Sequence, residues 1–129
     1  MNIFNYVLKS VKNLYGKNLI SLVVFGSYAR GTQNLNSDID ILIILKKSKK
    51  SRRDRLLEFI DNVKEDEVEI NPIIKTIDEV KITPLMYNIA LEGKILFDRN
   101  DFFLNFRNMI LNLNIKKYGV GGWGYLIWG

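Results

Sequence analysis

Cysteine and histidine are both missing from the 129 residues of this sequence. Without cysteine the chain can form no disulfide and offers no thiol nucleophile, which is typical of a cytoplasmic protein. The lack of both residue types also argues against a zinc site, because zinc is held mainly by imidazole and thiolate ligands. Carboxylates are therefore the metal ligands to look for.

Long apolar runs are missing as well. A membrane-spanning helix needs about eighteen or more consecutive apolar residues, and the sequence has no such stretch. Residues 1–14 lack the continuous apolar segment of a signal peptide, and their apolar spacing predicts an amphipathic helix instead. We therefore expect a cytoplasmic protein that makes no contact with a membrane.

The residues that are present suit a single domain. Hydrophobic residues make up 47% of the chain, which is enough for one core. The formal net charge of +5 favours anionic partners such as nucleotides, RNA or an acidic protein surface. A basic run at residues 46–53 is interpreted as a solvated loop leading into a helix, and the alternative is a docking patch for an acidic partner.

Apolar periodicity and helix-end signals predict a chain that mixes helices and strands. Helices are expected over residues 4–14, 27–30, 51–63 and 85–92 and from a cap at Asp101 onward, and strands over 19–25, 39–45, 65–74 and 95–97. The strand at 19–25 is nearly all apolar and is expected to be covered on both faces. Pro72 should mark either the end of the third strand or an edge position.

The segment 26–40, GSYARGTQNLNSDID, joins the first two strands and concentrates the polar chemistry. Asp38 and Asp40 are two residues apart at the start of a strand, so their side chains point the same way with Cα atoms about 7 Å apart. Two such carboxylates repel each other unless a cation lies between them, and hard oxygen ligands suit Mg²⁺. The alternative is a hairpin whose aspartates only cap an edge.

The turn at Gly26 and Ser27 follows directly after the first apolar strand. Such a turn offers backbone N–H groups and a hydroxyl to an anion such as a phosphate. A phosphate-binding turn and a pair of metal-binding carboxylates within one segment predict a site for a nucleoside triphosphate.

This segment also resembles a known signature. Gly26-Ser27, ten intervening residues and then Asp38-Ile39-Asp40 are similar to the motif of the polymerase-β-like nucleotidyltransferases, in particular the minimal nucleotidyltransferase (MNT) family. The resemblance implies an α/β (α+β) fold, in which a small mixed β-sheet has helices packed against it. We expect this domain to span residues 1–117, with residues 118–129 as a glycine- and aromatic-rich tail that either folds back on the domain or reaches a partner.

The resemblance also implies roles for individual residues. Gly26 would let the backbone approach the triphosphate, Ser27 would hydrogen-bond its terminal oxygens, and Arg30 would contact phosphate unless it is only a surface cation. Asp38 and Asp40 would hold Mg²⁺.

Nucleotidyl transfer gains from a third carboxylate, which in the family comes from the next core strand. Glu67, Glu69 and Asn71 share one face of that strand. Glu69 is the first candidate and Glu67 the second, and a merely solvated strand face is the alternative.

The implied function is Mg²⁺-dependent transfer of AMP from ATP to a hydroxyl. Little of a chain this short remains to bind the acceptor, so we expect another protein to supply it. Stand-alone members of the family are typically paired with a HEPN toxin and act as antitoxins by modifying a toxin tyrosine. Two alternatives stay open: a binding module that occludes its partner without catalysis, and a small-molecule nucleotidyltransferase with a pocket shared in a homo-oligomer. Nucleic acid is not expected as the direct substrate.

Overall fold

A four-stranded sheet forms the centre of the computed structural model, which describes residues 2–63 and 68–117. The strands are β1 (Leu19–Phe25), β2 (Ile39–Leu45), β3 (Ile70–Thr76) and β4 (Lys94–Asp98). Their order across the sheet is β3-β2-β1-β4. Because β1 runs antiparallel to β2 and β4 while β3 runs parallel to β2, the sheet is mixed, as expected.

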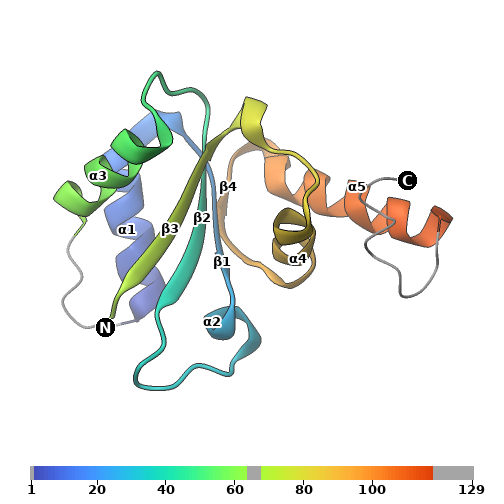
Figure 1. Ribbon diagram of the computed structural model, residues 1–129, viewed down its shortest axis with the longest axis horizontal. Helices are drawn as coiled ribbons and strands as arrows, with labels where there is room; N and C mark the ends of the chain where they lie inside the picture. The colour runs from blue at the N-terminus through green and yellow to red at the C-terminus, as the bar shows by residue number, and fades with distance from the viewer. Residues whose placement is uncertain (1, 64–67, 118–129) are drawn as a thin grey trace.

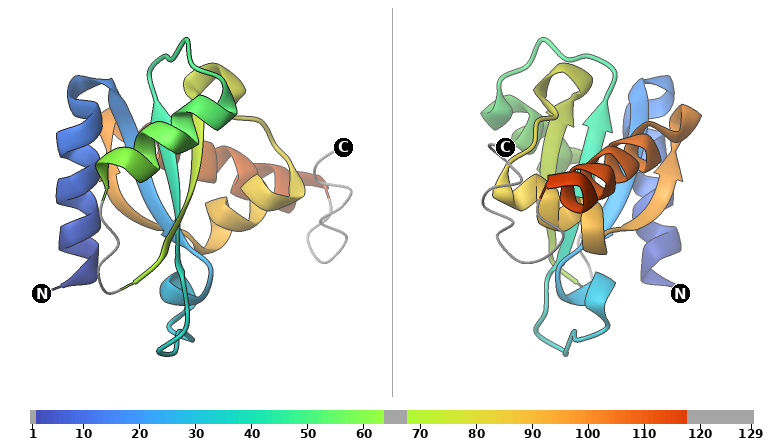
Figure 2. Two further views of the ribbon diagram at one scale, coloured as in Figure 1. Left: turned by 60° about the vertical axis from the view of Figure 1, so that its left-hand side comes forward. Right: turned by 90° about the vertical axis from the view of Figure 1, so that its right-hand side faces the viewer.

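Helices cover both faces of this sheet (Figure 1). They are α1 (Ile3–Tyr15), α2 (Ser27–Arg30), α3 (Arg52–Asn62), α4 (Pro84–Glu92) and α5 (Phe102–Lys117), with 3-10 turns η1 (Gly16–Asn18), η2 (Ile77–Glu79) and η3 (Arg99–Asp101). Figures 1 and 2 place α1 and α3 on one face and α4 and α5 on the other. None of the described helices is both long and apolar enough to cross a membrane.

The two central strands contribute side chains to a core on each face. In β2, Ile41 and Ile43 are buried in the cluster that contains residues of α1 and α3. Leu42 and Ile44 are buried in the second cluster, with residues of α4 and α5. This alternation confirms that the apolar runs are strands covered on both faces, since successive side chains of a strand point to opposite sides.

The third strand begins later than its sequence pattern predicts. Strand pairing starts at Ile70 and ends at Thr76, whereas the expected strand covered residues 65–74. Residues 64–67 lie outside the described part of the chain, as do residues 118–129 of the expected tail. Pro72 lies inside β3, opposite Ile41, and β3 is an edge strand. Of the two alternatives for Pro72, the edge position is confirmed and the end of the strand is wrong. An edge strand tolerates proline because one of its sides needs no N–H donor.

The cap of α5 also differs from the prediction. The Asp98 carboxylate accepts hydrogen bonds from the backbone N–H groups of Phe103 and Leu104, both at 2.9 Å. It also accepts a bond of 2.6 Å from the buried Ser21 hydroxyl. Asp101 instead has a positive φ of 56° in the preceding turn, so the predicted cap at Asp101 is wrong. The last residue of β4 caps the helix and thereby ties α5 to the sheet.

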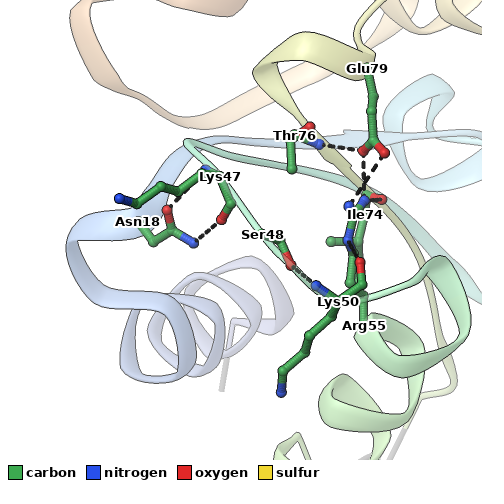
Figure 3. Close-up of polar contacts among 8 residues, drawn as sticks. All are labelled: Asn18, Lys47, Ser48, Lys50, Arg55, Ile74, Thr76 and Glu79. Carbon is green, nitrogen blue, oxygen red and sulfur yellow. Dashed lines mark hydrogen bonds and ion pairs between the residues drawn. The ribbon is translucent and has the colours of Figure 1, made fainter.

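A buried arginine joins α3 to the end of β3 (Figure 3). Arg55 is 6% exposed and donates to the carbonyl oxygens of Lys50 and Ile74. Its guanidinium pairs with Glu79 at 2.6 Å, and Glu79 also accepts a 2.8 Å bond from the Thr76 N–H. Hydrogen bonds from Arg55, followed by that from Thr76, lower the pKa of Glu79 from 4.5 to about 2. The charged form of Glu79 is thus favoured by folding.

Replacing this carboxylate should weaken the fold in a pH-dependent way. Glu79→Gln leaves the buried Arg55 without its counter-ion, so we expect the free energy of unfolding at neutral pH to fall by about 1–2 kcal/mol, a modest figure because Glu79 is partly exposed. Since folding lowers the pKa of Glu79, its contribution is complete above pH 4.5 and is lost as the pH falls toward 2. Urea denaturation of the unmodified protein and of Glu79→Gln measures this. The difference between their free energies of unfolding should become smaller as the pH falls from 4.5 toward 2.

The control is Glu58→Gln, the same change in the exposed Lys50–Glu58 pair. An exposed ion pair contributes little, so this variant should lose less than about 0.5 kcal/mol. Equal losses in the two variants would contradict the role given to Arg55 and Glu79.

Candidate functional site

Two carboxylates stand at the beginning of β2, at the end of the sheet where α2 lies (Figure 1). Asp38 immediately precedes the strand, and Asp40 is its second residue, opposite Phe25 of β1. Ile39 between them is buried in the core beneath α1 and α3, so the two aspartates point to the other face. Both aspartates are half-buried.

An asparagine amide bridges the two carboxylates. The Nδ2 of Asn71 donates to Asp38 Oδ2 at 3.0 Å and to Asp40 Oδ1 at 3.4 Å. Asn71 is the second residue of β3 and lies in parallel register with Asp40, which directs both side chains to the same face of the sheet. One oxygen of each carboxylate thus converges on a single point, as a cation held between them would require.

The Gly26 turn closes one side of this point. Gly26 has φ 71° and ψ −150°, a conformation open to glycine but strained for other residues. A Cβ at this position would overlap Oδ2 of Asp40. Within the described part of the chain, no side chain caps the first turn of α2. The N–H groups of Ala29 and Arg30 bond the Gly26 carbonyl oxygen. Those of Ser27 and Tyr28 are therefore the ones suited to an anion at this turn.

Arg30 lies on the rim and pairs with a carboxylate of α4. Its Nη1 is 3.0 Å from Glu92 Oε1, and the two side chains are 51% and 33% exposed. The sequence suggested a phosphate contact for Arg30. To contact a phosphate, the Arg30 side chain must leave its ion pair with Glu92. Both side chains are partly exposed, so Arg30 can move to make the new contact.

The structure does not gather Glu69 into a group of three carboxylates with Asp38 and Asp40. Glu69 is an exposed residue just before β3, and its carbonyl oxygen accepts a 2.8 Å bond from the Ile39 N–H. In the ranges 2–63 and 68–117, no three Asp, Glu, His or Cys residues are grouped so that they could hold a metal ion. Glu67 falls outside these ranges, and the roles of both glutamates stay predictions.

Asn71 is the site residue that the motif did not indicate. The strand pattern placed it on the same face as Glu69, but only the register between β2 and β3 brings it against Asp40. The register follows from pairing across 31 residues of chain, which no local pattern reports.

The donor atoms at this point suit a hard divalent cation. Asp38 and Asp40 supply carboxylate oxygens, and a turned Asn71 amide would supply a carbonyl oxygen, all of which are ligands of Mg²⁺. Because Gly26 has no Cβ, the Asp40 carboxylate can lie directly against the turn. The residues present therefore fit a Mg²⁺–nucleotide site.

An apolar groove elsewhere on the molecule lacks this chemistry. It has a volume of about 510 Å³, and none of the described residues that line it carries a carboxylate. Apolar side chains such as Ile77, Phe102 and Met109 line most of it. Lys81 and Arg99 give the groove positive charge, but a metal–triphosphate also needs carboxylates to hold its cation, so size alone does not make the groove the nucleotide site.

The family match covers this site. Residues 5–97 match the nucleotidyltransferase domain family, a range that includes β1, β2, β3 and the turn at Gly26. The chain therefore belongs to the nucleotidyltransferase domain family and is a nucleotidyltransferase. The family match confirms the resemblance to nucleotidyltransferases that the Gly26–Asp40 motif indicated.

Relatives of known sequence differ in how much of their length they share. MJ1305 of Methanocaldococcus jannaschii, a candidate protein adenylyltransferase, is 37% identical over 119 residues, which cover 84% of this chain and 79% of that protein. Spectinomycin 9-adenylyltransferase of Staphylococcus aureus is 27% identical over 86 residues, which cover 62% of this chain but 33% of that enzyme. The second likeness is thus confined to a part of the larger enzyme.

Solved structures share the fold. A chain in the crystal structure of a toxin–antitoxin complex with AMP-PNP superposes with a TM-score of 0.58 at 22% identity, covering 92% of this chain and 94% of that chain. A chain in the structure of a tri-AMPylated Shewanella oneidensis HEPN toxin with its MNT antitoxin gives 0.53 at 16% identity, covering 90% of each. These likenesses confirm the nucleotidyltransferase fold.

The close approach of Gly26 to Asp40 can be tested by adding one methyl group. In Gly26→Ala, the Cβ would overlap Asp40 Oδ2 and the backbone would be strained, so we expect a loss of about 2–3 kcal/mol in the free energy of unfolding. Urea denaturation measures it.

Gly31→Ala is the matched control. Gly31 also has a positive φ, 75°, but a Cβ there would meet no atom within 4 Å. We expect this variant to lose only about 1 kcal/mol, the cost of the left-handed backbone alone. Equal losses in the two variants would contradict the close packing of Gly26 on Asp40.

Proposed function

We propose that this protein transfers AMP from ATP, with Mg²⁺, to a hydroxyl group of a partner protein. The observation that carries the proposal is the convergence of Asp38 and Asp40 on one point beside the Gly26 turn. A metal-binding pair and a phosphate-binding turn in contact with each other are what a nucleoside triphosphate with its cation needs.

The residues of the turn bind the phosphates. Gly26 has no side chain to block the approach of the triphosphate, and the amide groups at the start of α2 donate to its oxygens. The Ser27 hydroxyl adds a further donor. Arg30 supplies positive charge at the rim once it exchanges Glu92 for phosphate.

The carboxylates orient the reacting group. Asp38 and Asp40 hold the cation, and Mg²⁺ when bound would neutralise charge on the phosphates. The acceptor oxygen forms a bond to the α-phosphorus as the bond to the pyrophosphate oxygen breaks, and pyrophosphate leaves. The acceptor proton passes to a carboxylate, for which Glu69, exposed at the start of β3, is our candidate.

The acceptor is proposed to be a tyrosine of a HEPN-type toxin, which makes this protein an antitoxin. The described helices pack on the sheet, with Phe103 and Phe106 of α5 in its core, and so leave few elements for an acceptor pocket. Support comes from MJ1305, a candidate protein adenylyltransferase, and from folds shared with chains of toxin–antitoxin complexes. The likeness to spectinomycin 9-adenylyltransferase covers 33% of that enzyme, which favours a shared nucleotidyl-transfer core over a shared drug pocket.

The proposal predicts which phosphate of ATP labels the partner. Purified protein, a HEPN-type toxin and Mg²⁺ should give a labelled toxin with α-³²P-ATP and no label with γ-³²P-ATP, because pyrophosphate leaves. Mass spectrometry should place one AMP or more on tyrosine. Asp38→Asn combined with Asp40→Asn should reduce labelling at least about 100-fold, since both charged metal ligands are lost.

Asp61→Asn, an exposed change of the same kind at the end of α3, is the control and should label at the normal rate. Labelling that persists in the double variant would contradict the assigned metal site. A partner that is neutralised without nucleotide binding, and equally well by Glu69→Gln, would favour a binding module that acts by occlusion.

A further inference from the structure

The amide of Asn71 lies beside the two carboxylate oxygens that would hold the proposed cation. Its Nδ2 lies 3.0 Å from Asp38 Oδ2 and 3.4 Å from Asp40 Oδ1. An amide nitrogen carries two N–H groups, so one Asn71 can donate to both carboxylates at once. In this state the amide offsets the repulsion between two negative side chains that β2 holds on the same face.

The same side chain can also serve a bound cation. The amide oxygen and nitrogen are bonded to the same carbon. A half-turn about the last side-chain bond therefore places the oxygen where the nitrogen was. Neighbouring oxygen ligands around Mg²⁺ lie about 3 Å apart, given bonds of about 2.1 Å in octahedral geometry. The distances from the Asn71 amide to the two carboxylates, 3.0 and 3.4 Å, match that spacing.

We propose that Asn71 is an exchangeable partner of the two aspartates: its Nδ2 bridges them when no cation is bound, and its Oδ1 becomes a third oxygen ligand when a cation binds. This inference rests on the proposed metal site. Asn71 of β3 would then both position the two aspartates and bind the cation, so the cation needs no third carboxylate as a ligand. The site then carries two negative charges rather than three, which lets the cation-free protein keep its carboxylates together without strong repulsion.

A carboxylate at this position could fill only the second of these roles. Asn71→Asp removes the N–H donors and adds a charge, so the cation-free protein should be destabilised by repulsion while its affinity for a divalent cation rises. Asn71→Leu has similar volume and no polar atoms, so it should lose both the bridge and the third oxygen. The two variants therefore shift cation affinity in opposite directions, which a purely structural role for Asn71 would not do.

The experiment measures the affinity of the protein for Mn²⁺ in the absence of nucleotide. The electron paramagnetic resonance signal gives the concentration of free Mn²⁺, and Mg²⁺ is added as a competitor. Relative to the unmodified protein, we expect about 10-fold tighter binding in Asn71→Asp and about 3-fold or more weaker binding in Asn71→Leu. The thermal midpoint of Asn71→Asp should fall without cation and recover with Mn²⁺. Asn108→Asp, the same substitution at an exposed position of α5, is the control and should match the unmodified protein in both measurements.

The outcomes separate this inference from the proposed function. If the unmodified protein binds Mn²⁺ and the double variant Asp38→Asn with Asp40→Asn does not, the proposed metal site is supported. Unchanged affinity in both Asn71 variants would then overturn the role of Asn71 alone, as would a fall in affinity in Asn71→Asp. If the unmodified protein and the double variant are equally unable to bind Mn²⁺, the proposed metal site itself fails, and the role of Asn71 fails with it.

Discussion

Two negative charges placed on alternate residues of a buried strand repel each other, and the site depends on how that repulsion is offset. β2 is paired on both sides, with β1 and with β3, which fixes Asp40 and leaves Asp38 directly before the paired Ile39. The Asn71 amide donates to both carboxylates, and the Gly26 turn that begins α2 lies against Asp40. The same arrangement suits a cation and an anion side by side, which is the charge pattern of a metal–triphosphate.

The rest of the fold keeps these donors in place. Asn71 reaches the aspartates only because β3 pairs with β2 in one register, and β3 is an edge strand with a neighbour on one side only. At the far end of β3, Arg55 bonds the Ile74 carbonyl oxygen and pairs with Glu79. This buried contact attaches the edge strand to α3. A network remote from the site thus helps to set the position of Asn71.

Local patterns in the sequence predicted the strands and helices, whose formation depends on residues close together in the chain. The apolar runs predicted β1 and β2 to the residue, and the short helix expected after Gly26 is present. These features follow from side-chain alternation, helical spacing and capping chemistry, each of which acts over a few residues.

What the patterns missed are contacts between distant segments. The cap of α5 comes from Asp98, the partner of Arg30 is Glu92, and the amide between the aspartates belongs to Asn71. Each depends on strand register or on how helices pack on the sheet, which single-sequence periodicity does not encode. The strand pattern puts Glu69 and Asn71 on one face, yet it cannot tell which residue of β3 lies opposite Asp40.

The most direct test of the account follows backbone amide chemical shifts while AMP-PNP and Mg²⁺ are added to the isotope-labelled protein. If the triphosphate binds at the Gly26 turn with its cation on the two aspartates, the largest shifts will occur at Gly26, Ser27 and Asp40 and will require Mg²⁺. Shifts confined to the apolar groove at Phe102 and Met109, or no shifts at saturating nucleotide, would contradict it.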